Sequence, residues 1–229
     1  MPGPVTILRN IAFAIAFYGG SFPLIGWAGI ASLLRLRGAT GAVQAWSDWH
    51  HWCVRNLLGI RIVVEGNAPA GGHLVASKHE SFFEAIHLPA LLDRPVPFAK
   101  AELWRIPGWG PAATRWGAVA VHREQGAKML RRMITDGKAY AAQDRVLAIF
   151  PEGSRVPHGA KPKLQSGFAG LYKMLGVPVV PMAVNSGPLY HRGWKRSGTI
   201  TIRFGEIIPP GLPRDEVEAR VREAINVLN

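Results

Sequence analysis

From residue 60 onward the chain alternates short apolar runs with longer segments of helical periodicity. Short apolar runs bounded by turn signals are typical of buried strands, and helices between them are typical of α/β domains. The expected strands are 60–65, 74–77, 96–100, 118–121, 146–150, 179–184 and 200–204. The expected helices are 84–92, 125–143, 168–175 and 213–228. The sequence therefore predicts an α/β fold with a mixed sheet of about seven strands flanked by helices.

An uncharged apolar segment, residues 10–34, precedes this region and has arginines at both ends. A straight helix of this length would reach about 37 Å, enough to cross a bilayer. The run Gly-Gly-Ser-Phe-Pro at 19–23 is typical of a helix break. Two short helices dipping into one leaflet and one kinked span are therefore both open. In either case residues 1–38 form a membrane-associating helical segment and residues 39–229 a separate domain.

The overall charge restricts the partners of the protein. The 27 lysines and arginines outnumber the 15 aspartates and glutamates, for a formal net charge of +12. Such a surface favours an anionic partner, either nucleic acid or an acidic membrane. Eight tryptophans favour the membrane, and the sequence has no helix-turn-helix, zinc-finger or RNA-binding signature. We therefore expect an anionic membrane surface and no nucleic acid.

Cysteine and histidine patterns exclude further classes. The single cysteine, Cys53, cannot form an internal disulfide and is interpreted as a buried structural thiol. His50 and His51 are adjacent, so they cannot bind one metal from the same helix face, and we interpret them as polar positions at an interface. His79-Glu80 does not begin an H-E-x-x-H motif, because position 83 is Phe. No metal is expected.

The segment after the 74–77 strand carries the strongest candidate for chemistry. His79 and Glu84 are five residues apart, which would separate them by about 140° on one helix. They can meet only if His79 lies in the turn and Glu84 in the first helical turn. Glu84 would then accept a proton from one imidazole nitrogen and leave the other free as a general base. Ser81 and Glu84 also match a capping box, and the two interpretations are not exclusive.

Three later segments also place distinctive residues at the ends of apolar strands. Lys100 stands at the end of one strand, before a turn rich in Pro, Gly and Trp. The run Phe-Pro-Glu-Gly-Ser-Arg at 150–155 carries Arg155 away from the sheet, and a guanidinium suits bidentate phosphate binding. The run at 177–181 contains two prolines, which predict irregular pairing or an edge strand.

Taken in order, these segments resemble the blocks of the glycerophospholipid acyltransferase family, and most closely those of bacterial 1-acylglycerol-3-phosphate acyltransferases. The resemblance covers roughly residues 60–205. The four blocks are carried by His79 and Glu84 (the HX4E form of the first block); Lys100, Leu103, Ile106, Pro107 and Gly110; Phe150–Arg155; and Val177–Pro181. The sequence departs at Glu84, where Asp is usual, and at Lys78, where Asn is frequent. Glutamate occurs in related lipid acyltransferases that use other acceptors.

The resemblance implies that residues 39–229 form an acyltransferase domain. This O-acyltransferase would move an acyl chain from acyl-CoA or acyl-acyl carrier protein to the sn-2 hydroxyl of 1-acylglycerol 3-phosphate, giving phosphatidic acid in phospholipid biosynthesis. His79 would be the general base, oriented by Glu84. Arg155 and Lys100 would hold the acceptor phosphate, in a pocket shaped by Glu152 and Gly153. The acyl donor would be a co-substrate, and no cofactor is implied.

Other functions remain open at this stage. The acceptor could be glycerol 3-phosphate or a lyso-ornithine lipid, or the chain could be a non-catalytic lipid-binding relative. Both acyl donors are soluble and cytosolic. We therefore expect the protein on the cytoplasmic face of the inner (plasma) membrane.

Overall fold

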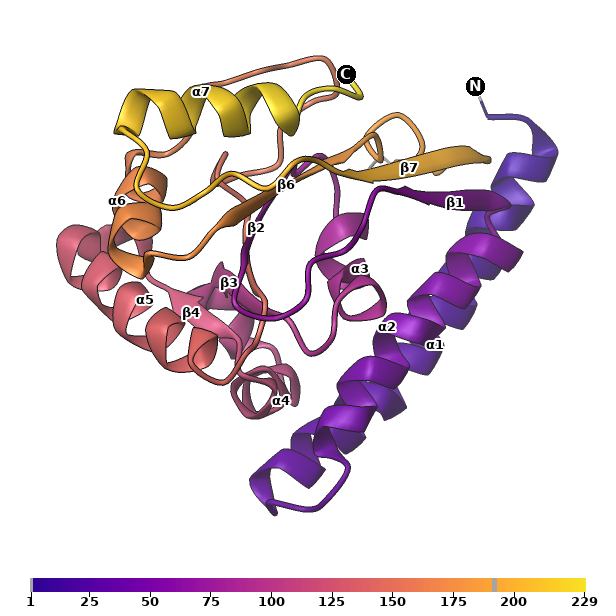
Figure 1. Ribbon diagram of the computed structural model, residues 1–229. Helices are drawn as coiled ribbons and strands as arrows, with labels where there is room; N and C mark the ends of the chain where they lie inside the picture. Colours follow the sequence, from indigo (N-terminus) through magenta and orange to yellow (C-terminus); the bar gives the residue numbers. More distant parts are fainter. Residues whose placement is uncertain (1, 191–192) are drawn as a thin grey trace.

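The computed structural model describes residues 2–190 and 193–229, which contain a seven-stranded sheet. Figure 1 shows this sheet between two layers of helices. The helices are α1 (Pro4–Leu33), α2 (Ala39–Asn56), α3 (Phe83–Leu91), α4 (Trp109–Trp116), α5 (Gly126–Ala141), α6 (Ser166–Leu175) and α7 (Arg214–Ala224), with short 3-10 turns η1 (Ala101–Arg105) and η2 (Arg123–Gln125). The strands are β1 (Ile60–Glu65), β2 (Leu74–Ser77), β3 (Val96–Lys100), β4 (Val119–Val121), β5 (Leu147–Ile149), β6 (Val179–Val184) and β7 (Gly198–Phe204). The predicted fold class and all seven predicted strands are confirmed.

The sheet has the strand order β1-β7-β6-β2-β5-β3-β4. Neighbouring strands are parallel except β6 and β7, which are antiparallel, so the sheet is mixed. The strand β2 lies in the middle, between β6 and β5. The loops that follow β2, β5, β3 and β4 therefore leave the same edge of the sheet, where α/β folds commonly bind their ligands.

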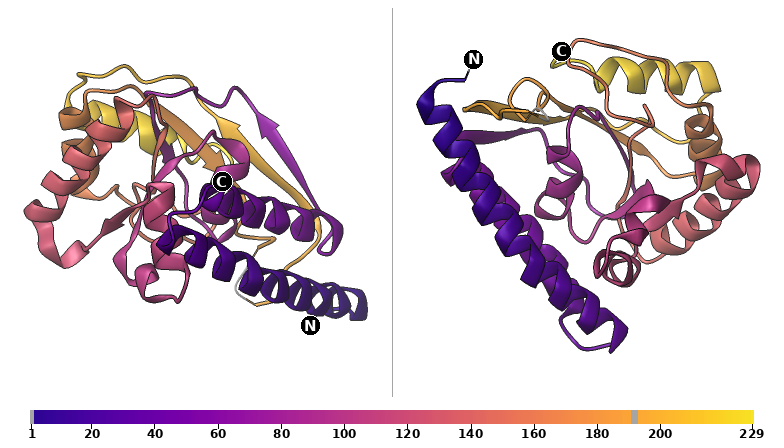
Figure 2. Two further views of the ribbon diagram at one scale, coloured as in Figure 1. Left: turned by 90° about the horizontal axis from the view of Figure 1, so that it is seen from below. Right: turned by 180° about the vertical axis from the view of Figure 1, so that it is seen from behind.

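Two apolar cores cover the faces of the sheet. Val75 of β2 faces a core completed by α1, α2 and α3, whereas Leu74 and Ala76 face a core completed by α5, α6 and α7. This alternation follows from the two-residue period of a strand. Figure 2 shows the same layers from below and from behind, with α1 on the outside of α2. The sheet is thus buried on both faces, as its nearly continuous apolar strands require.

The helix α1 is continuous through the predicted break at 19–23. The Trp46 indole donates to the Ser21 hydroxyl at 2.9 Å, and the Trp49 indole donates to a backbone carbonyl of α1 at 3.2 Å. A side chain at Gly20 would collide with the Trp49 ring. Contacts from α2 therefore support the turn around Pro23. The two-helix hairpin within 10–34 is wrong, and the single helix of the other alternative is present. Among the described residues, α1 is the one helix long and apolar enough to cross a membrane.

The proline-containing strand β6 is central rather than an edge strand. Pro181 pairs in register with Ala76 of β2, and every residue of β6 is buried. On the side of β6 that faces β7, the Pro181 carbonyl accepts from Gly205 N at 2.9 Å. Pro181 lies between the isolated bridge Val179–Ile208 and the regular β6–β7 ladder, which starts at Met182. The missing N–H of Pro181 thus falls where β6–β7 pairing is irregular. Irregular pairing is confirmed, and the edge position is wrong.

The sequence suggested that both histidines of α2 lie at a polar interface. This prediction is wrong for His50. His50 is fully buried and its Nε2 lies 2.9 Å from the Tyr190 hydroxyl. His51 is half-buried and stacks on His87 of α3 with ring centroids 5.0 Å apart. Burial lowers the pKa of His50 well below its ordinary value and raises the pKa of the neighbouring buried Cys53 to about 11. These groups belong to the apolar core, and Cys53 is buried as predicted.

The buried imidazole of His87 should make stability depend on pH. Burial lowers its pKa from 6.5 to about 3, with a smaller contribution from His51. Below pH 6.5 the unfolded chain binds a proton that the folded protein does not bind, so stability contributed by this group is present above pH 6.5 and is lost as the pH falls. We expect His87→Phe to remove about 1.6 kcal/mol of the loss in unfolding free energy between pH 6.5 and pH 5, because the unfolded imidazole goes from half protonated to almost fully protonated over this interval. Urea unfolding in detergent at both pH values measures this, and equal losses in wild type and variant would contradict it.

Candidate active site

The predicted pair of His79 and Glu84 is in contact at the carboxyl end of β2. His79 lies in the turn, and Glu84 lies in the first turn of α3. Glu84 Oε1 is 3.0 Å from His79 Nδ1. The strand–turn–helix geometry needed for this contact is therefore present, and it holds the imidazole by its Nδ1 nitrogen.

The Glu84 carboxylate is fully buried and surrounded by donors. Its Oε1 accepts from the backbone N–H groups of Glu80 at 2.5 Å and Ser81 at 2.7 Å, in addition to His79. Its Oε2 accepts from the hydroxyls of Ser81 at 3.0 Å and Ser186 at 2.7 Å. The Ser81 hydroxyl also accepts from Phe83 N at 3.0 Å, as a capping residue does. The N-cap of α3 is Phe82, one residue after the predicted capping serine, but Glu84 bonds back to Ser81 N and Ser81 accepts from Phe83 N as the capping interpretation requires. These bonds and the His79 contact hold together and fix the carboxylate in place.

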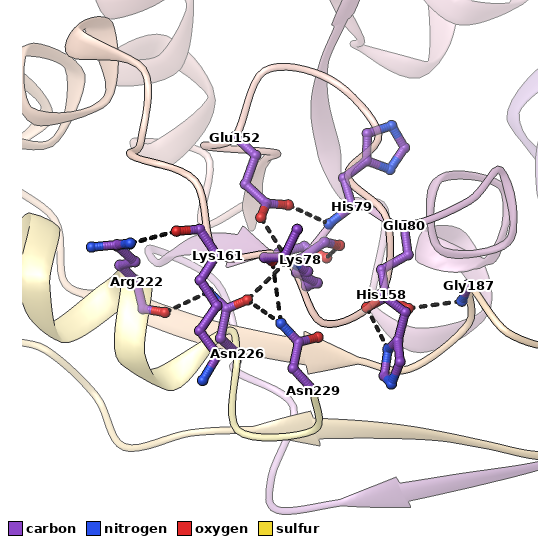
Figure 3. A network of polar contacts seen from close by, with 12 residues as sticks. Lys78, His79, Glu80, Glu152, His158, Lys161, Gly187, Arg222, Asn226 and Asn229 are labelled. Carbon is purple, nitrogen blue, oxygen red and sulfur yellow. Dashed lines mark hydrogen bonds and ion pairs between the residues drawn. The ribbon is translucent and has the colours of Figure 1, made fainter.

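The His79 ring has one engaged nitrogen and one face covered. It stacks on Phe150 with ring centroids 4.1 Å apart and an interplanar angle of 22°. Its side chain is 16% exposed, so the ring edge is still accessible. Since Glu84 engages Nδ1 as the acceptor, Nδ1 carries the proton and Nε2 keeps its lone pair. Figure 3 shows the imidazole pointing away from the Lys78 side chain.

The turn after β5 supports the backbone of His79. The strands β5 and β2 are parallel neighbours, with Ile149 opposite Ala76. This register brings Glu152 beside the turn, where its Oε2 accepts from His79 N at 3.0 Å. Gly153 follows with φ +75° and takes a conformation that suits glycine. Of the predicted phosphate pocket, Glu152 is thus buried beneath the His79 turn, and its other oxygen is bonded to Lys78.

The two predicted phosphate-binding cations lie at the same edge of the sheet. Arg155 is half-buried, and its guanidinium lies 4.0 Å from the centroid of the Phe82 ring, next to the His79 turn. Lys100 ends β3, and its Nζ lies 3.1 Å from an oxygen of Glu102, with both side chains about half exposed. Arg155 is thus beside the pair, whereas Lys100 follows a strand further along the sheet.

Two further polar residues at this edge were not predicted from the sequence. Arg123 follows β4 and donates from its guanidinium to the carbonyl of Gly153. Ser186 follows β6 and bonds to Glu84. Both come just after a predicted strand, as His79 and Arg155 do, so the rule of polar residues at strand ends could have found them.

A second buried carboxylate, Glu80, lies next to the pair without touching the His79 ring. It accepts from Gly187 N at 2.7 Å and lies 2.9 Å from His158 Nδ1. Burial raises the pKa of Glu80, and its hydrogen bonds with Gly187 and His158 oppose this shift. Its contacts connect the loops after β5 and β6 to the turn. Among residues 2–190 and 193–229, no three His, Cys, Asp or Glu side chains are arranged to hold a metal.

An apolar cavity of about 90 Å³ lies beside α3, between α1, α2 and α4. Ile86 and Leu88, which follow Glu84 on α3, line one side, and Trp46, Trp109 and Trp116 line others. Polar atoms contribute little to this lining. The site therefore combines a polar edge at the sheet with an apolar space on the side of α1.

The chain is similar to known acyltransferases. Residues 60–185 match a family model described as acyltransferase. The chain is 32% identical to the 1-acyl-sn-glycerol-3-phosphate acyltransferase of Pseudomonas aeruginosa over 88% of its length and 80% of that protein. It is 28% identical to the human 1-acyl-sn-glycerol-3-phosphate acyltransferase alpha over 75% of its length and 65% of that protein.

A solved structure has the same fold. The crystal structure of the 1-acyl-sn-glycerophosphate acyltransferase PlsC from Thermotoga maritima aligns with a TM-score of 0.76 and 22% sequence identity. The alignment covers 96% of this chain and 95% of that chain. The shared fold therefore includes the N-terminal helices as well as the sheet.

Proposed function

Because the chain belongs to the acyltransferase family, we propose that it transfers an acyl chain from a thioester donor to the sn-2 hydroxyl of 1-acylglycerol 3-phosphate. The product would be phosphatidic acid, an intermediate of phospholipid biosynthesis. The observation that carries this proposal is the 3.0 Å contact between His79 Nδ1 and the buried Glu84 carboxylate. It orients an imidazole whose other nitrogen is left for the substrate.

The chemistry needs one base, one acyl donor and one hydroxyl. His79 Nε2 takes the proton of the acceptor hydroxyl as its oxygen attacks the thioester carbonyl. The tetrahedral intermediate collapses, the C–S bond breaks, and the leaving sulfur takes the proton from the imidazolium. Glu84 holds the Nδ1 proton and stabilises the positive charge of the imidazolium during these steps. The acceptor oxygen is itself the nucleophile, so an acyl-enzyme is unnecessary.

Positioning of the acceptor is assigned to the cations at the sheet edge. Arg155 would bind the acceptor phosphate through its planar guanidinium, with Lys100 contributing charge and Gly153 allowing close approach of the backbone. Arg123 supports the same turn through the Gly153 carbonyl. Glu152 acts from beneath, through His79 N. An acyl chain would extend on the apolar side, toward the cavity between α3 and α1.

The test of this function is an acyl-transfer assay in detergent micelles. Wild-type protein is incubated with lysophosphatidic acid and labelled acyl-CoA, and then with acyl-acyl carrier protein as donor. We expect labelled phosphatidic acid with at least one donor. Failure with both donors, together with activity on glycerol 3-phosphate or a lyso-ornithine lipid, would show a different acceptor. Lipid binding without transfer to any acceptor would contradict the enzymatic function.

The exposed apolar face of α1 indicates how the protein contacts the membrane. Its side chains Val5, Leu8, Ile11, Ile15, Tyr18, Phe22, Trp27, Ile30 and Leu33 are exposed. The opposite side packs on the domain along its length: Asn10 bonds to the backbone of Lys195, and Gly29 lies against Gly108. A helix held in this way cannot cross the bilayer without drawing the domain in with it. We therefore infer that the exposed face enters one leaflet, on the cytoplasmic side where either donor is found.

Substitutions on this face should release the protein from membranes. We expect Ile15→Ser, Phe22→Ser and Leu33→Ser together to lower the partition coefficient onto anionic vesicles roughly a thousandfold, at about 1.5 kcal/mol for each side chain. Vesicle sedimentation measures the bound fraction. Ile207→Ser, Met174→Ser and Val227→Ser, at exposed positions outside α1, form the control and should leave binding unchanged. Binding of the α1 variant equal to that of the control would contradict the inference.

A further inference from the structure

Lys78, the residue before His79, is a fully buried cation that takes no part in the proposed proton transfer. Its ammonium donates to Glu152 Oε1 at 2.7 Å and to Asn226 Oδ1 at 2.8 Å, as Figure 3 shows. It also donates to Ala160 O at 2.8 Å. An ammonium has three N–H donors, so these three acceptors satisfy it completely. Lysine is almost never fully buried unless it is paired in this way.

The lysine acts on His79 through Glu152. Both side chains of this ion pair are 0% exposed. One carboxylate oxygen accepts from Lys78, and the other accepts from His79 N at 3.0 Å. Two backbone hydrogen bonds hold the chain on either side of this N–H. Lys78 N donates to Met182 O at 2.8 Å, and His79 O accepts from Val156 N at 2.7 Å. The His79 N–H, just beyond the ladder of β2, thus has a carboxylate in place of a strand carbonyl.

The third acceptor of Lys78 comes from the far end of the chain. Asn226 follows α7, is 3% exposed and is 148 positions from Lys78. Its amide donates to Arg222 O at 2.7 Å, and its Oδ1 also accepts from Asn229 at 2.6 Å. The Arg222 guanidinium in turn donates to the carbonyl of Lys161. The end of the chain is therefore bonded both to the loop after Arg155 and to the residue before His79.

We propose that Lys78 and Asn226 are positioning residues for His79, so that the C-terminal end of the chain is part of the support of the active site. The inference rests on the proposed role of His79 as general base. Without Lys78, the Glu152 carboxylate would be left buried without its counter-charge, an unfavourable state that is relieved by moving toward water. The His79 N–H would lose its partner, and the imidazole would shift relative to Glu84 and the acceptor hydroxyl.

Steady-state kinetics in micelles test the proposal. A displacement of about 1 Å costs on the order of 100-fold in rate, so we expect Lys78→Met to lower kcat about 100-fold and Asn226→Leu about 10-fold, with KM changed less than about threefold. The double variant Lys78→Met/Glu152→Gln removes both charges of this buried pair and keeps an acceptor for His79 N–H. It should recover about tenfold in kcat over Lys78→Met, a rescue that independent effects would not give.

The matched control is a variant of Arg145, which also bonds to several groups but lies away from His79. Arg145 donates to the carbonyl of Arg94, in the loop before β3, and to the carbonyl of Trp116, the last residue of α4, at the opposite edge of the sheet. We expect Arg145→Met to lower the Tm and leave kcat unchanged. Lys78 and Asn226 variants that are folded and lose only Tm, with wild-type kcat, would overturn the proposal. If Lys78→Met does not fold, Asn226→Leu decides alone, because it leaves the Lys78–Glu152 pair intact.

A spectroscopic measurement separates this proposal from the proposed function. The His79 Nδ1 proton, hydrogen-bonded to Glu84, should give a low-field proton NMR resonance that is assigned by its loss in His79→Ala. We expect Lys78→Met and Asn226→Leu to shift or broaden this resonance, and Arg145→Met to leave it in place. An unmoved resonance in both variants would overturn the positioning role. A moved resonance in a protein without acyl transfer would support positioning while the proposed function fails.

Discussion

His79→Ala should lower the rate of acyl transfer by at least three orders of magnitude. The substitution removes the base that takes the hydroxyl proton and the acid that returns it to the leaving sulfur, and general acid–base groups contribute about 100- to 10,000-fold each. Because His79 is 16% exposed and its side chain is not a large part of a core, the variant should fold. The kcat with lysophosphatidic acid and the better donor measures the effect.

The same strand provides the control for this prediction. His73 precedes β2 and bonds to the carbonyl of Gly71, at the opposite end of the strand from His79. His73→Ala removes an equal number of atoms and should change kcat by less than about threefold, as surface substitutions usually do. Retention of activity in His79→Ala would show that Glu84 is only a helix cap, and the proposed mechanism would be wrong.

Glu84→Gln should lower kcat about 100- to 1,000-fold, with KM for the acceptor nearly unchanged. The amide can keep its oxygen toward His79 and the backbone N–H groups of Glu80 and Ser81. Its NH2 group can donate to the hydroxyls of Ser81 and Ser186, which are able to accept. The variant therefore retains the hydrogen bond to His79 Nδ1 and loses the negative charge that stabilises the imidazolium. Kinetics in micelles separate kcat from KM.

Glu80→Gln is the matched control for the charge. Glu80 is also a buried glutamate at this turn, but its carboxylate bonds to Gly187 and His158 and not to His79. Burial raises the pKa of Glu80, so its environment disfavours the charged form. We expect its kcat to stay within about fivefold of wild type, since only the backbone of Glu80 faces the pair. Equal losses in both variants would assign the effect to the loop rather than to the charge beside His79.

The strands were predictable because their signal is local. Apolar runs of strand length separated by amphipathic segments define α/β order, and all seven strands appear within two residues of their expected limits. The contact between His79 and Glu84 was also predictable, because a turn followed by a helix brings positions five apart together. The capping and catalytic interpretations could not be separated, since one buried carboxylate serves both arrangements.

Errors in the prediction arose where distant contacts override local preference. Gly-Gly and Pro break an isolated helix, but the α2 tryptophans hold α1 continuous. Pro181 suggested an edge, but the irregular β6–β7 pairing accommodates it in the centre of the sheet. His50 looked polar on a helix that lies against α1 and α3, which bury it.

By itself, the sequence determined the α/β order, the apolar N-terminal segment and the residues at the strand ends that belong to the four blocks. These features depend on periodicity and on spacing within a few residues, which a linear sequence carries directly. Only the tertiary structure decided that Glu152 lies beneath His79, that Lys78 neutralises it, and that Asn226 completes the network. These contacts join positions 73 to 148 residues apart, and their geometry is set by the packing of β2, β5 and α7 rather than by any local preference.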